Sequence, residues 1–158
     1  MAEEAGGRGL DGIDLAIIGG GPGGYPAAFL AARLGMRVTL IDPEPNPGGV
    51  CLWRGCIPSK ALLHVAHTLD EAAQAQAYGV AFGPPRLDLA RVRAWKDGVV
   101  ETLTAGLGGQ MKKLGVRHLR GRAGFLDARR LRVDLDGGRR QEIAFTHAII
   151  ATGSRPAM

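Results

Sequence analysis

The pattern of apolar and polar positions changes near Val116, and the change divides the 158-residue chain into two kinds of structure. Before it, short apolar runs at residues 13–18 and 37–41 alternate with segments in which apolar residues recur every three or four positions. Short bounded runs are typical of buried strands, and the longer spacing is typical of helices. Beyond Val116, apolar and polar residues alternate, as in strands with one exposed face. The pattern predicts an α/β fold with a parallel sheet, helices and an antiparallel β-meander.

Two long helices are expected in the middle of the chain, at residues 57–76 and 87–114. We expect the second to be a surface helix that packs on the sheet, with Gly115 as its C-terminal cap. Three glycines weaken the later part of this helix, because glycine has a low helix propensity: Gly106, Gly108 and Gly109.

The alternating region is expected to form short strands joined by tight turns. Turns are predicted at Ala128-Arg129 and at Asp136-Gly137-Gly138. Strands are predicted at residues 116–121, 123–127, 131–135, 142–145 and 147–151.

A glycine-rich turn separates the first predicted strand from a helix that extends to Leu34. Gly19, Gly21 and Gly24 have the spacing of the dinucleotide fingerprint, in which the glycines permit a tight turn, a close pyrophosphate and close helix packing. The second predicted strand ends at Asp42, where a carboxylate can accept hydrogen bonds from ribose hydroxyls. Strand, turn, helix and strand together predict a Rossmann-like nucleotide-binding domain.

Two cysteines lie five positions apart in the segment that follows. Cys56 precedes Pro58 and an apolar run at helical spacing, which places its thiol at a helix N-terminus, where a thiolate is stabilised. Cys51 lies one short loop upstream, close enough to form a strained and easily reduced disulfide. Lys60 follows Cys56 by one helical turn and adds a positive charge on the same face. The segment predicts thiol–disulfide chemistry.

Other interpretations of the cysteine pair are buried free thiols, a structural disulfide or a zinc site. The zinc site would use His64 and His67 with the two cysteines, but these histidines are closer together than the usual ligand spacing. A redox pair is the interpretation that we favour, with no metal ligands assigned.

The formal net charge of +5 arises mainly from arginines, many of them between Arg117 and Arg140. A nucleic-acid surface is one interpretation of this cluster. The solvated face of an antiparallel ribbon is favoured instead, because the arginines alternate with apolar residues and no recognition helix or stacking aromatic residues accompany them. We therefore expect no nucleic-acid partner.

No apolar run reaches the length of a membrane span, and the length of the chain suits one globular domain. Residues 1–12 form an expected flexible N-terminal segment with neither a signal core nor an arginine-rich amphipathic helix. We expect a cytoplasmic location without membrane association, because only two cysteines occur, in a redox-like arrangement.

The run GCIPSKALL, from Gly55 to Leu63, closely resembles the redox-active segment of the pyridine nucleotide–disulfide oxidoreductases. Within that family it is most similar to the dihydrolipoamide dehydrogenases. The resemblance implies FAD as cofactor and NAD as co-substrate, with the disulfide against the flavin ring. Cys51 would be the interchange thiol, Cys56 would hold thiolate charge beside the flavin, and Lys60 would lie near its reactive edge.

The resemblance also extends beyond the cysteines. Ala123, in an expected turn at 121–123, matches a position whose backbone meets the adenine, and the motif at residues 151–156 would lie near the phosphates. Trp53 and Val50 depart from the asparagine and threonine common in the family. With the glycine fingerprint, the expected cofactor-binding residues are Gly19, Gly21, Gly24, Asp42, Gly48, Gly49, Val50, Cys51, Lys60, Ala123, Thr152, Gly153 and Ser154.

Residues 13–156 match, in order, the N-terminal part of the family's FAD-binding domain. Nothing in the chain resembles the family's separate nicotinamide-binding and dimerisation domains, so we expect an incomplete, N-terminal piece of a longer flavoenzyme. The resemblance implies that the parent is a homodimer that oxidises a dithiol such as dihydrolipoamide, within a 2-oxoacid dehydrogenase complex. We expect the piece alone to be inactive.

Three alternatives remain open. The parent can be another disulfide reductase of the family, of the glutathione, mercuric or trypanothione type. The chain can instead be a non-catalytic module that binds FAD or cycles its thiols. A plain NAD-binding Rossmann protein is disfavoured, because nicotinamide binding does not require two cysteines at this spacing.

Overall fold

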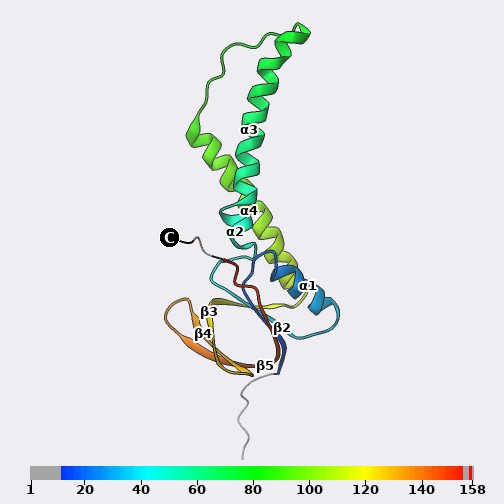
Figure 1. Cartoon of the computed structure of the whole chain (residues 1–158), viewed down its shortest axis with the longest axis vertical. Helices are drawn as coiled ribbons and strands as arrows, with labels where there is room; N and C mark the ends of the chain where they lie inside the picture. Colours follow the sequence, from blue (N-terminus) through cyan, green and yellow to red (C-terminus); the bar gives the residue numbers. More distant parts are fainter. Residues whose placement is uncertain (1–11, 155–156, 158) are drawn as a thin grey trace, which may run out of the picture.

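The computed structural model describes residues 12–154 and residue 157. The expected flexible segment lies, apart from Gly12, outside the described residues, as do Arg155 and Pro156 of the last motif. The strands gather at one end of the molecule, and two long helices project from it as a hairpin (Figure 1). The elements are β1 (Ile13–Ile18), α1 (Tyr25–Arg33), β2 (Val38–Asp42), α2 (Gly49–Trp53), α3 (Cys56–Gln74), the 3₁₀ helix η1 (Ala75–Tyr78), α4 (Leu89–Lys113), β3 (Arg117–Asp127), β4 (Arg130–Leu135) and β5 (Arg140–Ile150).

The first sheet is parallel and has β1 in an interior position. β1 pairs with β2 on one side and with β5 on the other, so Ile17 lies between Leu40 and Ile149. β2 pairs in turn with the first part of β3. All but one of the β1 residues are buried, as expected for a strand covered on both faces. The predicted Rossmann-like parallel sheet is confirmed.

The expected antiparallel meander is present, but it is built from longer strands than predicted. β3 and β5 each run without interruption from the parallel sheet into a ribbon with β4, closing the strands into a barrel in the order β1-β2-β3-β4-β5. The partner of β3 changes between Arg120, which is opposite Asp42 of β2, and Gly121, which is opposite Leu135 of β4. The turn predicted at residues 121–123 is therefore wrong, because the strand changes partner there without leaving the extended conformation.

A similar correction applies to the last strand, where the two predicted segments at 142–145 and 147–151 form one β5. Its first half pairs with β4, up to Ala144 opposite Arg130, and its second half pairs with β1 from Phe145 onward. The predicted turns at Ala128-Arg129 and Asp136-Gly137-Gly138 are confirmed.

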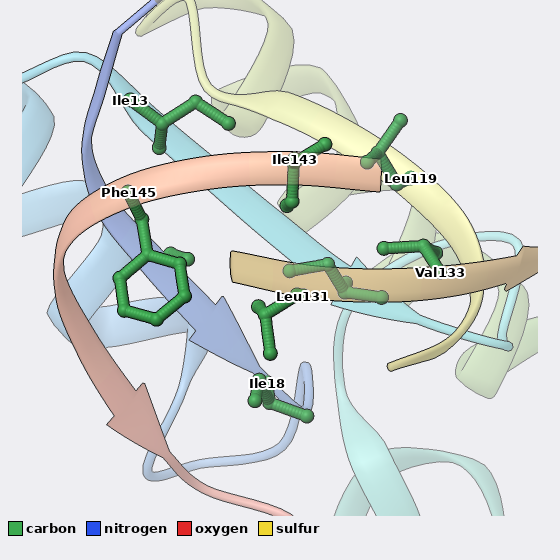
Figure 2. Packing of buried hydrophobic residues seen from close by; sticks show 9 residues of the cluster. Ile13, Ile18, Leu119, Leu131, Val133, Ile143 and Phe145 are labelled. Carbon is green, nitrogen blue, oxygen red and sulfur yellow. The ribbon is translucent and has the colours of Figure 1, made fainter. Parts of the chain in front are cut away.

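Two apolar cores lie on opposite sides of the parallel sheet. Figure 2 shows the barrel core, in which labelled side chains from β1, β3, β4 and β5 point toward one another inside the curve of the strands. Leu131 and Val133 are completely buried there, and burial of such a side chain contributes about 1.5–3 kcal/mol. The second core packs α1 and the end of α4 on the sheet, and its buried residues include Phe29, Met111 and Leu40.

The predicted long helices are present, but α4 departs from its expected role. Its last turns pack on the sheet through Met111, and Gly115 caps it with φ +69° while Val116 N–H donates to the Met111 carbonyl at 3.1 Å. Its first half instead lies along α3, away from the sheet, with Trp95 near the His64 ring. The expected packing on the sheet is therefore present, but only in the last turns of α4. None of the described helices is long and apolar enough to cross a membrane.

Two glycines of α4 have different surroundings although they are two positions apart. A Cβ added at Gly108 would come within 2.1 Å of the Asn46 Oδ1 atom, whereas a Cβ at Gly106 would meet nothing within 4 Å. Gly108 therefore makes room for the loop that precedes α2, and Gly106 only weakens the helix.

We expect Gly106→Ala to stabilise the chain by about 0.5–1 kcal/mol, because alanine loses less conformational freedom in a helix. Gly108→Ala is expected to destabilise it by about 1–3 kcal/mol, because Asn46 must move to admit the methyl group. The two variants make the same change in the same helix. Urea unfolding measures the free energy of unfolding of each. Equal effects of the two changes would contradict the packing role of Gly108.

Candidate functional site

The glycine turn between β1 and α1 brings backbone segments into very close contact. A Cβ at Gly19, which has φ +104°, would lie 2.3 Å from the Ala151 carbonyl oxygen, and one at Gly24 would lie 1.8 Å from the Gly19 oxygen. Gly21 differs, since its nearest neighbour there is the Gly49 Cα atom at 3.8 Å. The first and third glycines are required for packing, and the second leaves open space at the start of α1.

Asp42 lies at the end of β2 and faces the glycine turn. Its Oδ2 atom accepts a hydrogen bond from the Gly20 N–H at 2.6 Å, and its Oδ1 atom accepts one from the Glu44 N–H at 2.8 Å. The side chain is buried, with 8% relative exposure for the residue. These bonds hold the carboxylate in one orientation, and the remaining lone pairs of its oxygens are available to a ligand.

A cavity of about 780 Å³ opens where β1, β2 and β5 end. This volume is within the range of roughly 300–1,000 Å³ typical of ligand sites, and its position at the carboxyl ends of parallel strands is where α/β sheets bind ligands. Of the residues expected to bind a cofactor, the cavity brings together ten: Gly19, Gly21, Asp42, Gly49, Val50, Cys51, Ala123, Thr152, Gly153 and Ser154.

Four expected site residues do not line the cavity. Gly24 packs against Gly19, and Gly48, at φ +149°, packs against Leu52, whose Cβ atom would be 2.8 Å from an added Cβ. Cys56 and Lys60 are exposed on the first turns of α3, beside the cavity.

The cysteines belong to two successive helices. Cys51 lies in the short α2 and is partly buried, whereas Cys56 is the first residue of α3 and is exposed. Both thiols are free. A hydrogen bond with the Cys56 thiol raises the pKa of Cys51, and local desolvation and the charge of Cys56 raise it further. The backbone N–H of Cys56 and then the Lys60 ammonium act in the opposite direction. The pKa of Cys51 thus depends on Cys56, which lies at the predicted helix start.

No described residues form a metal site, since nowhere do three His, Cys, Asp or Glu side chains gather for one. His64 stacks near Trp95 with ring centroids 6.0 Å apart, and His67 Nε2 lies 3.2 Å from the Glu71 carboxylate. Both interactions occur along α3, away from the cysteines. The zinc alternative therefore has no ligand set in this part of the chain.

Three charged residues that line the cavity were not predicted from the sequence: Glu44, Arg54 and Arg122. Glu44 and Arg54 form an ion pair. Next to it, the Trp53 Nε1 atom donates a hydrogen bond to the Asn46 carbonyl at 3.2 Å. The sequence signal was the position of Trp53 and Arg54 between the two cysteines, but their partners in the preceding loop could not be identified from spacing alone.

The residues of the cavity fit a dinucleotide such as FAD. A Cβ at Gly21 would point into space that no protein atom fills closely, and the N-terminus of α1 opens there with no acidic residue in its first turn. Such a terminus suits a pyrophosphate, because its N–H groups and dipole favour an anion. Asp42 provides a fixed acceptor for hydroxyl groups, and Cys51 lies in the wall of the same cavity.

The pH dependence of Cys51 reactivity tests the sulfur–sulfur interaction. Cys56→Ala removes both the hydrogen-bond partner and the neighbouring charge, so the pKa of Cys51 is expected to fall and its alkylation by iodoacetamide to begin at lower pH. Lys60→Gln is expected to shift the profile to higher pH, with Lys112→Gln at the end of α4 as control. Peptide mapping after pulsed alkylation measures the profiles. An unchanged profile in Cys56→Ala would show that the thiols do not interact.

Asp42→Asn tests the anchoring of the carboxylate. An asparagine presents only one oxygen, so its NH₂ group must face one of the two N–H donors. We expect a loss of about 1–3 kcal/mol in the free energy of unfolding, the cost of a buried polar group without a partner. Asp70→Asn, on the exposed surface of α3, serves as control. Equal urea midpoints for the two variants would refute the anchoring role.

The comparisons with known proteins agree on one family. The pyridine nucleotide-disulphide oxidoreductase family matches residues 13–158. The chain is 47% identical over 148 residues to dihydrolipoyl dehydrogenase 2 of Haloarcula marismortui, covering 92% of this chain and 31% of that protein. It is 43% identical over 142 residues to dihydrolipoyl dehydrogenase of Vibrio cholerae, and 45% identical over 140 residues to that of Geobacillus stearothermophilus.

These last two alignments cover 90% and 89% of this chain, but only 30% and 29% of the relatives. The chain thus spans about a third of the length of the relatives that it matches. Because the family match extends over nearly the whole chain, from β1 to its last residue, the chain belongs to the pyridine nucleotide-disulphide oxidoreductase family.

Proposed function

We propose that residues 13–156 provide the FAD-binding and disulfide-carrying part of a dihydrolipoyl dehydrogenase. The observation that carries the proposal is that Cys51 lines the cavity of the glycine turn and interacts with Cys56 at the start of α3. The names of relatives 43–47% identical to this chain support dihydrolipoamide as the dithiol. Another disulfide reductase of the family remains the alternative, distinguished by its substrate.

In the proposed reaction, one thiolate of the substrate attacks the Sγ atom of Cys51 in the Cys51–Cys56 disulfide. The bond between the two cysteines breaks, and Cys56 leaves as a thiolate at the N-terminus of α3, where the helix dipole stabilises the charge. The second thiol of the substrate then attacks the substrate's other sulfur, which is bonded to Cys51. The bond to Cys51 breaks, and the oxidised substrate is released. The protein is left with two reduced cysteines, so two electrons have passed to it.

Binding FAD in the cavity would supply an acceptor for these two electrons and a route for hydride to NAD. The backbone of the glycine turn and of α1 would hold the pyrophosphate, and Asp42 would accept hydrogen bonds from ribose hydroxyls. Gly49, Val50, Ala123, Thr152, Gly153 and Ser154 would form the walls. Lys60, one turn after Cys56, would add positive charge near the thiolate.

Assembly is a further part of this proposal. The chain spans 31% or less of the compared relatives. The nicotinamide step, a homodimer and membership of a 2-oxoacid dehydrogenase complex are therefore proposed for a protein of the relatives' length that contains this region.

The test is the visible spectrum of the chain loaded with FAD. Addition of dihydrolipoamide is expected to produce a long-wavelength thiolate-to-flavin band in the wild type. Cys51→Ser is expected to show the band without reductant, because Cys56 then has no disulfide partner, and Cys56→Ser is expected to lack it. A band in Cys56→Ser would assign the roles of the cysteines the other way round.

Substrate class is tested in the same preparation by adding glutathione in place of dihydrolipoamide. Rapid reduction of the disulfide by dihydrolipoamide alone is the expected result. Faster reduction by glutathione would favour the alternative reductase, and a chain that binds no FAD would contradict the proposal for residues 13–156.

A further inference from the structure

The segment between the two cysteines is attached to the loop that precedes it by two side chains. Arg54 forms an ion pair with Glu44, and Trp53 donates its Nε1–H to the Asn46 carbonyl at 3.2 Å. Neither contact involves a cysteine, and neither partner residue lies on a helix or strand. The contacts therefore join the segment between the two cysteines to the loop of residues 43–47.

That loop is a firm anchor, because it is fixed at both ends. At its start, the Glu44 N–H donates to Asp42, whose other oxygen accepts from the Gly20 N–H. At its end, Pro47 is fully buried and Asn46 lies against Gly108 of α4. Three prolines within the loop restrict its backbone further: Pro43, Pro45 and Pro47.

Arg54 also occupies the joint between the two helices that carry the cysteines. It is the C-cap of α2, where its N–H donates to the Val50 carbonyl at 2.9 Å, and Gly55 is the N-cap of α3. A change in the backbone at this joint would alter the position of Cys51 relative to Cys56. An interaction that fixes the Arg54 side chain therefore also restricts the distance between the sulfurs of Cys51 and Cys56.

We propose that Arg54 is a positioning residue, whose ion pair with Glu44 holds the α2–α3 joint and thereby keeps Cys51 close to Cys56. The role deepens the proposed function and rests on it, because it concerns the same disulfide. Trp53 supports the joint through its bond to Asn46. Arg54 itself points to Glu44 and acts on the thiols through the backbone.

The closeness of two thiols is measurable without FAD through exchange with glutathione. In this reaction the two cysteines and one oxidised glutathione give the Cys51–Cys56 disulfide and two reduced glutathiones. One S–S bond forms and one breaks, and the two thiol protons end on glutathione. A joint that separates the sulfurs lowers their effective concentration and shifts this equilibrium toward the dithiol.

Arg54→Gln is expected to lower the equilibrium constant by about two- to fivefold, the range for an ion pair whose arginine is largely exposed. Glu44→Gln is expected to give the same change, and the double variant no more than either alone. Arg130→Gln, which removes the exposed Arg130–Asp127 ion pair of the ribbon, is the matched control and is expected to have no effect. Acid quenching, thiol blocking and mass spectrometry measure the oxidised fraction.

Three further variants separate positioning from a general loss of structure. The exchanged pair Arg54→Glu with Glu44→Arg is expected to restore much of the constant, and Arg54→Lys to restore part of it, because lysine keeps the charge without the planar fork. Trp53→Phe keeps the ring, removes the donor and is expected to shift the equilibrium in the same direction as Arg54→Gln. Far-UV circular dichroism and urea midpoints verify that each variant is folded.

The outcomes distinguish this role from the proposed function. If the wild-type chain forms no Cys51–Cys56 disulfide at any glutathione ratio, the proposed redox function fails and the positioning role fails with it. If the wild type forms the disulfide and Arg54→Gln leaves the constant unchanged, only the positioning role is overturned. A loss that the exchanged pair does not restore also overturns it.

Discussion

The structure depends on a close approach of backbone at the end of β1. The Gly19 site has no room for a side chain because the Ala151 carbonyl lies there, and Gly24 has none because the Gly19 oxygen lies there. These contacts let β5, β1 and α1 meet at one point, and the cavity begins at that point. A Cβ at either position would separate the elements, so the packing of the fold and the shape of the site share one constraint.

The parallel half of the fold followed from the sequence because its signals are local. The run from Ile13 to Ile18, the glycine spacing and the strand that ends at Asp42 each specify an element within a few residues. The ribbon was less well predicted, since short strands and turns give the same alternation as long strands that change partners. Gly121 looks like a break in the sequence, but it is the place where β3 leaves β2 for β4.

Several of the predicted site residues come together in the structure, and their roles toward a cofactor stay predictions. Gly21, Asp42 and Cys51 were predicted from spacing or family resemblance and line a single cavity. Gly48 was assigned to the cofactor, yet it packs beside Leu52. The pair formed by Glu44 and Arg54 was missed, because an ion pair between two loops depends on tertiary structure that local patterns do not encode. The same reason explains why the packing role of Gly108 emerged only from its neighbour Asn46.

The pairing of β1 with β5 joins segments at opposite ends of the sequence, since Ile13 lies opposite Phe145 and Ile18 opposite Ile150. During synthesis from the N-terminus, the glycine turn therefore leaves the ribosome long before the strand that completes its surroundings. Closing so large a loop costs entropy that local helix formation does not repay, which makes this pairing a late step in folding. The cavity can take its final form only when β5 has been made, so a nascent chain of this protein acquires Cys51 and Cys56 well before it acquires the pocket beside them.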